Sequence, residues 1–215
     1  MQKLVIFDLD GTLLDTIADL NAALNHTLAE FNFTKISCEK TRELVGNGIR
    51  NLIIRASGTE DNIDLMFKCF MDYYNENVNV YTKPYNNIKE LIIKLKNIGF
   101  KLAVVSNKNI IPLKALVDYH FKDLFDLVLG DGMGYKRKPD PEITNECIKK
   151  LDSDINNTYY VGDSDVDVRT VMNTGCHGLF VSYGFREKEK LIEAGAKIIF
   201  DNVNDLTDYL LNVEL

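Results

Sequence analysis

The sequence predicts an α/β protein with a doubly wound parallel sheet core, helices on both faces and an inserted α-helical cap domain. Three observations favour this fold. A short apolar run near the start has the length of one buried strand. The stretch after it has helical periodicity over residues 17–80 and no strand pattern. From residue 82 onward strand and helix patterns alternate, which is typical of a parallel sheet covered by helices.

The first strand, Leu4–Phe7, leads directly into a short acidic segment. Asp8 and Asp10 are two residues apart, and side chains at this spacing in an extended chain point the same way. Carboxylates that face one site repel each other unless a cation is bound between them. Gly11 permits a turn beside a ligand, and Thr12 adds a small hydrogen-bonding group. The segment therefore predicts a metal-dependent site at the end of this strand.

The inserted helical domain is expected to span residues 16–81, which leaves residues 1–15 and 82–215 for the core. Apolar positions at helical spacing predict helices over residues 17–31, after Ser37, and over residues 49–56 and 63–74. Asp15 or Thr16 can cap the first of these helices. No strand pattern interrupts the series, so we expect these helices to pack on one another.

The rest of the core alternates between short apolar strands and amphipathic helices. Strands are expected over residues 101–105, 125–129, 159–161, 178–182 and 196–200. Helices are expected over residues 88–98, 110–119, 141–151, 166–175 and 205–211. Gly99 can end the first of these helices, and Pro141 suits a first helical position, where its missing N–H leaves no helical hydrogen bond unmade.

The composition is that of an ordinary globular protein, with 46% hydrophobic and 27% charged residues. A formal net charge of −7 argues against nucleic acid or an anionic membrane surface as the main partner. The four cysteines lack metal-ligand spacing, so buried free thiols are expected rather than a zinc site. The chain starts without a basic leader and has no apolar run of ~20 residues, which favours a cytoplasmic protein with no membrane span.

Polar side chains follow the ends of three expected strands. They are Asp8 and Asp10 after the first strand, Ser106 and Asn107 after the second, and Asp163 after a later one. Ligands of open parallel sheets bind beyond the carboxyl ends of the strands, so we expect these side chains to converge. Read alone, Ser106 and Asn107 are more typical of helix capping. In this context the hydroxyl and the following helix N-terminus suit a phosphate oxygen.

Two further segments carry charged residues near the same edge. In Lys138–Pro141 two prolines stiffen the backbone beside a lysine, so its ammonium can be presented with little loss of entropy. Asp163 and Asp167 are spaced to share one helical face, so Asp165 is expected to point elsewhere. Several acids on one rim indicate a divalent cation, and oxygen-only ligands favour Mg²⁺.

Four segments together resemble the signature motifs of the haloacid dehalogenase-like (HAD) phosphohydrolases. They are Asp8–Thr12, Ser106–Asn107, Lys138–Pro141 and Gly162–Asp167. The helical insertion resembles the cap of the phosphoglycolate phosphatase-like branch, as do the segments Val45–Arg50, Ser182–Arg186 and Ala194–Ala196. The resemblance covers nearly the whole chain and implies a Rossmann-like core.

The resemblance also implies a role for each motif residue. Asp8 is then the nucleophile, and Asp10 first protonates the leaving group and then activates water. The phosphoryl group is expected to be held by Thr12, Ser106, Asn107 and Lys138. Magnesium is expected to be held by Asp8, Asp10 (through its backbone carbonyl), Asp163 and Asp167.

The implied function is a magnesium-dependent phosphatase for a small phosphate monoester, with 2-phosphoglycolate as the first choice. The expected substrate contacts in the cap are Gly46, Asn47, Gly48 and Arg50. An arginine can bind a carboxylate through two hydrogen bonds, and Arg42 and Arg55 lie close by in the sequence. The expected partner is therefore a small organophosphate, and the expected state is a monomer or a weak homodimer.

Other functions stay open at this stage. A sugar phosphomutase, a pyrophosphatase or a nucleotide phosphatase of the same superfamily would carry the same core motifs. A non-enzymatic phospho-receiver also uses acids, a hydroxyl and a lysine on a doubly wound sheet. Receivers lack a large helical insertion and the Asp8–Thr12 motif, which disfavours that alternative.

Overall fold

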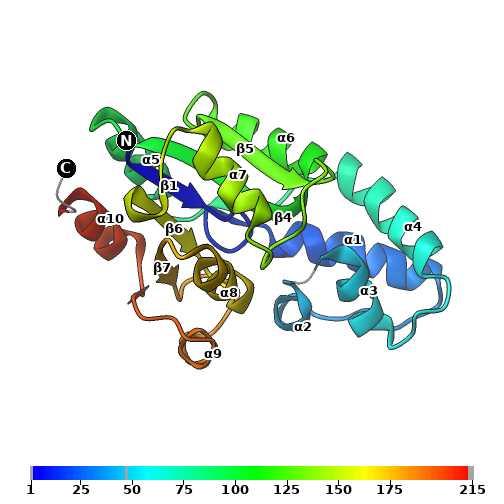
Figure 1. Ribbon diagram of the computed structural model, residues 1–215. Coiled ribbons are helices and arrows are strands. Elements are labelled where there is room, and N and C mark those ends of the chain that lie inside the picture. Colours follow the sequence, from blue (N-terminus) through cyan, green and yellow to red (C-terminus); the bar gives the residue numbers. More distant parts are fainter. Residues whose placement is uncertain (1, 47, 213–215) are drawn as a thin grey trace. The chain divides into compact units, whose positions relative to one another are not determined.

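The computed structural model describes residues 2–46 and 48–212, and its main feature is a six-stranded sheet. The strand order is β5-β4-β1-β6-β7-β8, and each neighbouring pair is parallel (Figure 1). The strands are β1 (Leu4–Phe7), β4 (Lys101–Asn109), β5 (Leu127–Asp131), β6 (Thr158–Gly162), β7 (His177–Val181) and β8 (Ile199–Phe200). This arrangement confirms the expected fold class.

Helices cover both faces of this sheet. They are α5 (Ile88–Asn97), α6 (Ile110–Phe121), α7 (Glu142–Lys150), α8 (Asp165–Thr174), α9 (Lys188–Glu193) and α10 (Val203–Asn212). On one face Leu4 and Ile6 of β1 share a buried cluster with Ile143 of α7. On the other face Phe7 packs edge-on against Phe125, with ring centroids 6.1 Å apart, and α6 lies against the same ring. Successive β1 residues therefore face opposite layers, and the whole strand is apolar because both faces are covered.

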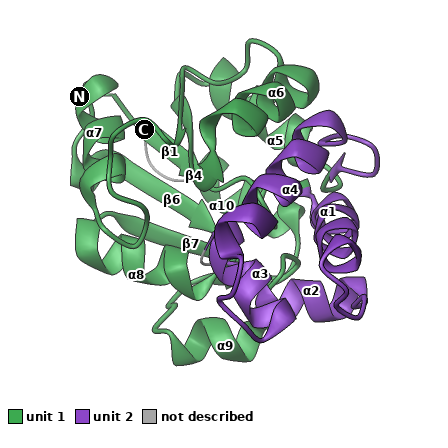
Figure 2. Ribbon diagram, turned by 90° about the vertical axis from the view of Figure 1, so that its right-hand side faces the viewer, with its two compact units in different colours: residues 1–14, 84–215 green, residues 15–83 purple. Residues whose placement is uncertain are grey.

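The chain divides into two compact units, coloured separately in Figure 2. Unit 1 consists of Met1–Leu14 and Pro84–Leu215, and unit 2 of Asp15–Lys83. Both divisions fall inside the paired short strands β2 (Leu14–Asp15) and β3 (Lys83–Pro84). The sequence analysis placed the divisions after residues 15 and 81.

Unit 2 is helical and has its own apolar core. Its helices are α1 (Ile17–Glu30), α2 (Cys38–Leu44), α3 (Ile49–Ser57) and α4 (Ile63–Glu76). Leu24 and Phe70, both fully buried, belong to this core. The buried carboxylate of Asp19 accepts hydrogen bonds from the backbone N–H groups of Tyr81 and Thr82 and from the Thr82 hydroxyl at 2.6 Å. This carboxylate fixes the last residues of the unit onto its first helix.

Several elements differ from the sequence-based expectation. β4 continues to Asn109, so Ser106 and Asn107 lie within the strand rather than after it. The reason is an irregularity after Val105: regular pairing with β5 stops there and resumes with Asn109 opposite Asp131. Helix α9 and strands β2 and β3 were not predicted, because each is shorter than the window that periodicity needs. No helix among the described residues is long and apolar enough to cross a membrane.

Candidate active site

The candidate site lies where three adjacent parallel strands end. Phe7 of β1 is opposite Val104 of β4 and Val161 of β6. Because these strands run in the same direction, the residues that follow them reach the same edge of the sheet. Asp8 is buried there and donates its backbone N–H to the Val161 carbonyl at 2.9 Å. This register explains why motif residues far apart in the sequence come together.

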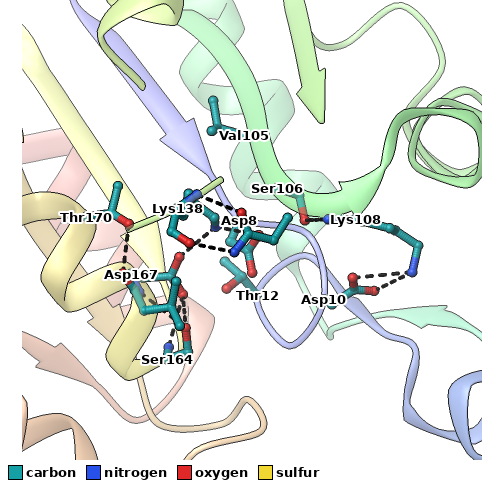
Figure 3. A network of polar contacts seen from close by, with 12 residues as sticks. Asp8, Asp10, Thr12, Val105, Ser106, Lys108, Lys138, Ser164, Asp167 and Thr170 are labelled. Carbon is teal, nitrogen blue, oxygen red and sulfur yellow. Dashed lines mark hydrogen bonds and ion pairs between the residues drawn. The ribbon is translucent and has the colours of Figure 1, made fainter. Parts of the chain in front are cut away.

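A buried lysine occupies the centre of the site. The Lys138 ammonium donates to Asp8 Oδ1 at 2.9 Å, to Asp167 Oδ1 at 2.8 Å and to the Tyr160 hydroxyl at 2.8 Å (Figure 3). The Tyr160 hydroxyl in turn donates to Asp167 Oδ1 at 3.0 Å. The Lys138 side chain is only 3% exposed. An ammonium has three donors, and these three acceptors match them.

Asn107 holds the backbone of Lys138 in place. Its side-chain N–H donates to the Lys138 carbonyl at 2.9 Å, and its Oδ1 accepts from the Lys138 backbone N–H at 2.8 Å. Both ends of the amide are thus engaged with one residue of the loop between β5 and α7. The phosphate-binding role predicted for Asn107 stays a prediction, and in this structure its side chain is bonded to the backbone of Lys138, another phosphate-binding candidate.

Asp167 is fixed by the start of α8. Its Oδ2 accepts from the Ser164 hydroxyl at 2.6 Å and from the Ser164 backbone N–H at 3.1 Å, and Ser164 Oγ accepts from the Asp167 N–H. This reciprocal pair is a capping box. Asp165 pairs instead with Arg169 at the surface, in line with the expectation that it points elsewhere.

Asp163 lies under a close-packed backbone. Its Oδ2 accepts from the Phe185 N–H at 2.7 Å, and its Oδ1 accepts from the Thr12 hydroxyl at 3.4 Å. A Cβ on Gly11 would lie 2.1 Å from Asp163 Oδ2, and one on Gly184 would lie 2.4 Å from the Asp163 Cβ. Only residues without a side chain fit at these two positions. The hydroxyl of Thr12, for which phosphate binding stays a prediction, contacts this carboxylate.

Asp10 lies apart from this network and has its own lysine. Lys108 Nζ is 3.0 Å from Asp10 Oδ1 and 3.3 Å from Oδ2 (Figure 3). The two side chains are 6% and 18% exposed, respectively. The backbone N–H of Lys108 donates to Ser106 Oγ at 3.2 Å, and Ser106 is itself buried. The site therefore contains two lysine–carboxylate pairs that serve different aspartates.

Burial and the repulsion between neighbouring carboxylates raise the pKa values of Asp8 and Asp163. Burial raises the pKa of Asp8 to about 6, with further upward contributions from the charges of Asp167 and Asp10 against the lowering effect of Lys138. Burial, with the charges of Asp167 and Asp8, also raises the pKa of Asp163 well above its usual range. Burial acts to lower the pKa of Lys138, but the charges of Asp167 and Asp8 raise it overall, so this ammonium stays charged.

Three of these acids fit a metal ion by their chemistry. One carboxylate oxygen from each of Asp8, Asp163 and Asp167 lies within 4.8 Å of the others, and all three residues are buried. The three carboxylates repel one another, and a bound divalent cation would relieve this repulsion. An all-oxygen donor set suits Mg²⁺. Asp167 already accepts two hydrogen bonds at each oxygen, whereas Asp163 accepts one at each and Asp8 accepts one from Lys138 at Oδ1, so Asp8 and Asp163 are the better direct ligands. The Asp10 side chain is outside this group, so only its backbone carbonyl suits the expected metal role.

Four residues of unit 2 were expected to contact substrate. Gly48 (φ 83°) directly precedes α3, and Gly46 also has a positive φ of 133°. Asn47 lies outside the described residues. The Arg50 guanidinium is 2.6 Å from Asp64 and stacks on the ring of Phe67 at 4.7 Å.

The other two arginines of this unit also have local partners. Arg55 donates to the Leu44 carbonyl at 3.0 Å, and Arg42 lies 4.0 Å from Asp15.

Sequence reasoning missed Lys108 and Tyr160. Lys108 directly follows the Ser106–Asn107 motif, so its place in the chain was a usable signal. Tyr160 precedes Gly162 by two residues and faces the same side of β6, but its sequence neighbours are all strand formers. Nothing in the local pattern separates this tyrosine from an ordinary core residue.

Comparisons with known proteins agree with this architecture. The sequence model of the family described as haloacid dehalogenase-like hydrolase matches residues 5–181. A phosphoglycolate phosphatase of Mesorhizobium japonicum is 32% identical to this chain, with 87% of this chain and 86% of the relative covered. One of Vibrio cholerae is 29% identical, with 97% of each chain covered. The crystal structure of a candidate phosphoglycolate phosphatase from Lactobacillus delbrueckii subsp. bulgaricus superposes with a TM-score of 0.94 at 32% identity, covering 99% of this chain and 100% of that one.

Proposed function

Because the chain belongs to the haloacid dehalogenase-like hydrolase family, in its phosphoglycolate phosphatase-like branch, we propose that it hydrolyses 2-phosphoglycolate through a phosphorylated Asp8. It is a phosphoric monoester hydrolase, and the proposal concerns its substrate, intermediate and metal. The observation that carries the proposal is the buried pair of Asp8 and Lys138, with the second carboxylate, Asp10, two residues away. A nucleophile, a fixed cation and an acid–base group are the parts that stepwise phosphoryl transfer requires.

In the first proposed step an Asp8 oxygen attacks the phosphorus atom. The bond between phosphorus and the ester oxygen breaks, and the leaving oxygen takes a proton from Asp10. In the second step a water oxygen attacks the same phosphorus, and Asp10 takes back a proton from that water. The bond between phosphorus and Asp8 then breaks, which releases inorganic phosphate and restores Asp8 as a carboxylate and Asp10 as a protonated acid.

Lys138 and Ser106 are the proposed contacts to the phosphoryl oxygens. The transition state of phosphoryl transfer spreads negative charge over those oxygens, so fixed positive charge and fixed donors stabilise it. Lys138 is held by Asp167, Tyr160 and its backbone bonds to Asn107, so little ordering is needed when substrate binds. Preorganisation of the lysine is the proposed contribution of those three residues.

Magnesium is the proposed metal, held by Asp8, Asp163 and the backbone carbonyl of Asp10, with Asp167 in support. When bound, the ion neutralises charge on the phosphoryl group and on the acids around it. The raised pKa values of Asp8 and Asp163 support this assignment, because a divalent cation beside these acids favours their ionised forms.

The substrate proposal rests on the names of the relatives and on the cations of the site. Several relatives that cover most of the chain are phosphoglycolate phosphatases. A small anionic ester suits a site with two buried lysines in an otherwise acidic protein. Unit 2 is the proposed cap, which would exclude bulk water during the reaction.

The test is release of inorganic phosphate from a panel of esters at equal concentrations. The panel contains 2-phosphoglycolate, glucose 6-phosphate, pyrophosphate and a nucleoside monophosphate, each with Mg²⁺ and with excess EDTA. We expect the highest kcat/KM for 2-phosphoglycolate and no release with EDTA. A higher kcat/KM for any other panel member would contradict the substrate. Conversion of a sugar phosphate to an isomer, without phosphate release, would identify a mutase.

The intermediate is tested by mass spectrometry of acid-quenched enzyme. In Asp10→Asn the first step lacks its acid and the second its base, so phosphorylated Asp8 should form slowly, accumulate over a long incubation because its hydrolysis is also blocked, and add one phosphoryl group to the peptide that contains it. Asp8→Asn is the matched control and should show no added mass. Equal labelling of both variants would place the covalent step elsewhere.

A further inference from the structure

The second buried lysine, Lys108, has no part in the chemistry proposed above. Its ammonium lies beside both oxygens of Asp10, and its side chain is only 6% exposed. A buried ammonium is costly unless a charged partner offsets its lost hydration, and Asp10 provides that partner here. A neutral hydrogen-bond donor would also orient Asp10, and it would cost less free energy to bury than an ammonium. A full positive charge at this position therefore calls for a further explanation.

Each lysine pairs with a different aspartate, and the two aspartates have the proposed roles at opposite ends of the scissile bond. Lys138 is 2.9 Å from Asp8, the group that attacks phosphorus, whereas Lys108 is 3.0 Å from Asp10, the group that protonates the leaving oxygen. Figure 3 shows Asp10 and Lys108 pointing toward each other, away from the network around Lys138. The charge of Lys108 is thus on the side of the leaving group.

A group attached to the leaving oxygen must lie close to this ammonium. The leaving oxygen comes within hydrogen-bonding reach of Asp10 when it is protonated, and Asp10 is itself bonded to Lys108. In a carboxymethyl ester one methylene separates the ester oxygen from the carboxylate, so that carboxylate comes within a few ångströms of the Lys108 ammonium. Without a cation it would be repelled by the ionised carboxylates of the site, since like charges in a buried site disfavour each other.

We propose that Lys108 is a specificity residue, which selects phosphate esters whose leaving group carries an anionic group next to the ester oxygen. The inference rests on the proposed function and adds to it the residue that recognises the leaving group. An ammonium can rotate and has three donors, so it can bind the substrate carboxylate while it stays next to Asp10. A neutral leaving group gains nothing from this charge. The recognising cation is then part of unit 1, on the same strand as Ser106.

The test compares two esters that differ only in this group. They are 2-phosphoglycolate and 2-hydroxyethyl phosphate, in which a neutral hydroxymethyl group replaces the carboxylate. We measure kcat/KM for both with the wild type, Lys108→Met, Lys108→Arg and Lys136→Met at one pH and saturating Mg²⁺. Lys136 is the matched control, because its side chain is 73% exposed and pairs loosely with Asp140 at 3.5 Å.

Wild-type enzyme should prefer 2-phosphoglycolate by about 10- to 100-fold, the usual value of a hydrogen bond to a charged group. Lys108→Met should lower kcat/KM for both esters, because Asp10 loses its partner, and should also abolish the preference. Lys108→Arg should keep part of the preference, and Lys136→Met all of it. An equal loss on both esters, with the preference intact, would show that Lys108 only positions Asp10 and would overturn the proposal.

Should Lys108→Met fail to fold, the wild type and Lys108→Arg still test the proposal, because a preference that Lys108→Arg leaves unchanged would not depend on this ammonium. Equal kcat/KM for the two esters would overturn the role of Lys108 while the proposed phosphatase chemistry stands. Failure to release phosphate from either ester, or from any member of the panel above, would contradict the proposed function itself. The two failures are therefore distinguishable in one set of assays.

Discussion

The charged side chains of unit 1 and unit 2 differ in burial and in what holds them. In unit 1 Lys138 and Asp167 are 3% and 0% exposed, and each is bonded to several other groups. In unit 2 the pair of Arg50 and Asp64 is 46% and 84% exposed. Removal of one partner from a buried ion pair leaves an uncompensated charge, whereas exposed pairs contribute ~0–1 kcal/mol. Substitutions in the two units should therefore differ in effect by orders of magnitude, and this difference can be tested.

The largest expected effect is that of Asp8→Asn. An amide is a poor nucleophile and a poor metal ligand, so kcat should fall by about 10⁴-fold or more. Asp165→Asn is the matched control, since Asp165 belongs to the same acidic motif as Asp163 but pairs at the surface with Arg169. It should stay within about threefold of the wild type. Phosphate release by refolded Asp8→Asn at more than a few per cent of the wild-type rate would contradict Asp8 as nucleophile.

Replacement of Gly11 by alanine should have the next largest effect. In Gly11→Ala the new Cβ would lie 2.1 Å from Asp163 Oδ2, so this carboxylate, a proposed metal ligand, has to move. Gly134→Ala is the matched control, because Gly134 has the same φ of +87° and nothing within 4 Å of the added Cβ. Both variants carry the strain of a positive φ, about 1 kcal/mol. Only Gly11→Ala should lower kcat further, by about 100-fold, and weaken Mg²⁺ binding in a calorimetric titration. Equal losses would mean that backbone strain alone explains the effect.

Metal removal and pH should act together on stability. The pKa of Asp8 is raised to about 6 in the metal-free fold, above its ordinary value of 3.8. The folded state thus binds a proton that the unfolded state has lost, so this contribution to stability is present below about pH 4 and is lost as the pH rises through 6. If Mg²⁺ binds the ionised acid as proposed, it should restore stability at high pH.

Thermal melts with Mg²⁺ and with EDTA measure this effect. At a ~100-fold excess over its Kd, Mg²⁺ should raise Tm by about 5–10 °C at pH 7.5, and by clearly less at pH 5. Asp8→Asn removes one of the two titrating ligands and should reduce this pH dependence, while Asp163 keeps its share. A Tm increase that is the same at both pH values would contradict the assignment of Asp8 as a metal ligand.

The core elements were predictable because their signals are local. The apolar run Leu4–Phe7 needs only its own residues to be recognised as a buried strand, and the alternation after residue 82 fixes a parallel sheet. Once the strands are parallel and adjacent, the residues after them must meet at one edge. Asp8 and Asp163 were therefore predictable as neighbours without any knowledge of their side-chain contacts.

The hydrogen-bonding partners were not predictable, because they depend on register across distant segments. Asn107 bonds to the backbone of Lys138, 31 residues later, and Tyr160 bonds to a lysine from another loop. Lys108 reaches Asp10, 98 residues away, only because β4 continues past an irregularity that no sequence pattern signals. Residue type indicated which side chains have the chemistry, and the fold determined which of them act together.

Tyr160→Phe should have a moderate effect that separates buried hydrogen bonding from packing. The loss of one hydroxyl removes a donor from Asp167 and an acceptor from Lys138, while the ring still fills its place. We expect a loss of about 10-fold in kcat/KM and about 1–2 kcal/mol in the free energy of unfolding. Inorganic phosphate should also inhibit more weakly, because Lys138 is less well held. Tyr159→Phe, one residue away and stacked on His177, is the matched control and should change neither quantity.

Arg50→Ala should have the smallest effect, and it tests the comparison from the side of unit 2. A role for Arg50 in substrate binding would require its guanidinium to leave Asp64 and the ring of Phe67. The ion pair with Asp64 is exposed and the ring of Phe67 is half-buried, so the loss of both contacts should cost less than ~1 kcal/mol of stability. Since Lys108 is the proposed partner of the substrate carboxylate, kcat/KM for 2-phosphoglycolate should fall by less than about threefold.

Asp64→Asn sharpens this last prediction, because it releases Arg50 without removing it. If Arg50 binds substrate in competition with Asp64, its release should raise kcat/KM for 2-phosphoglycolate, but not for 2-hydroxyethyl phosphate. We expect no change for either ester. A 10-fold loss of the preference for the carboxylate ester in Arg50→Ala, with the preference intact in Lys108→Met, would place recognition of the carboxylate in unit 2. The exposed pair would then matter more than the buried one, and the contrast between the two units would fail.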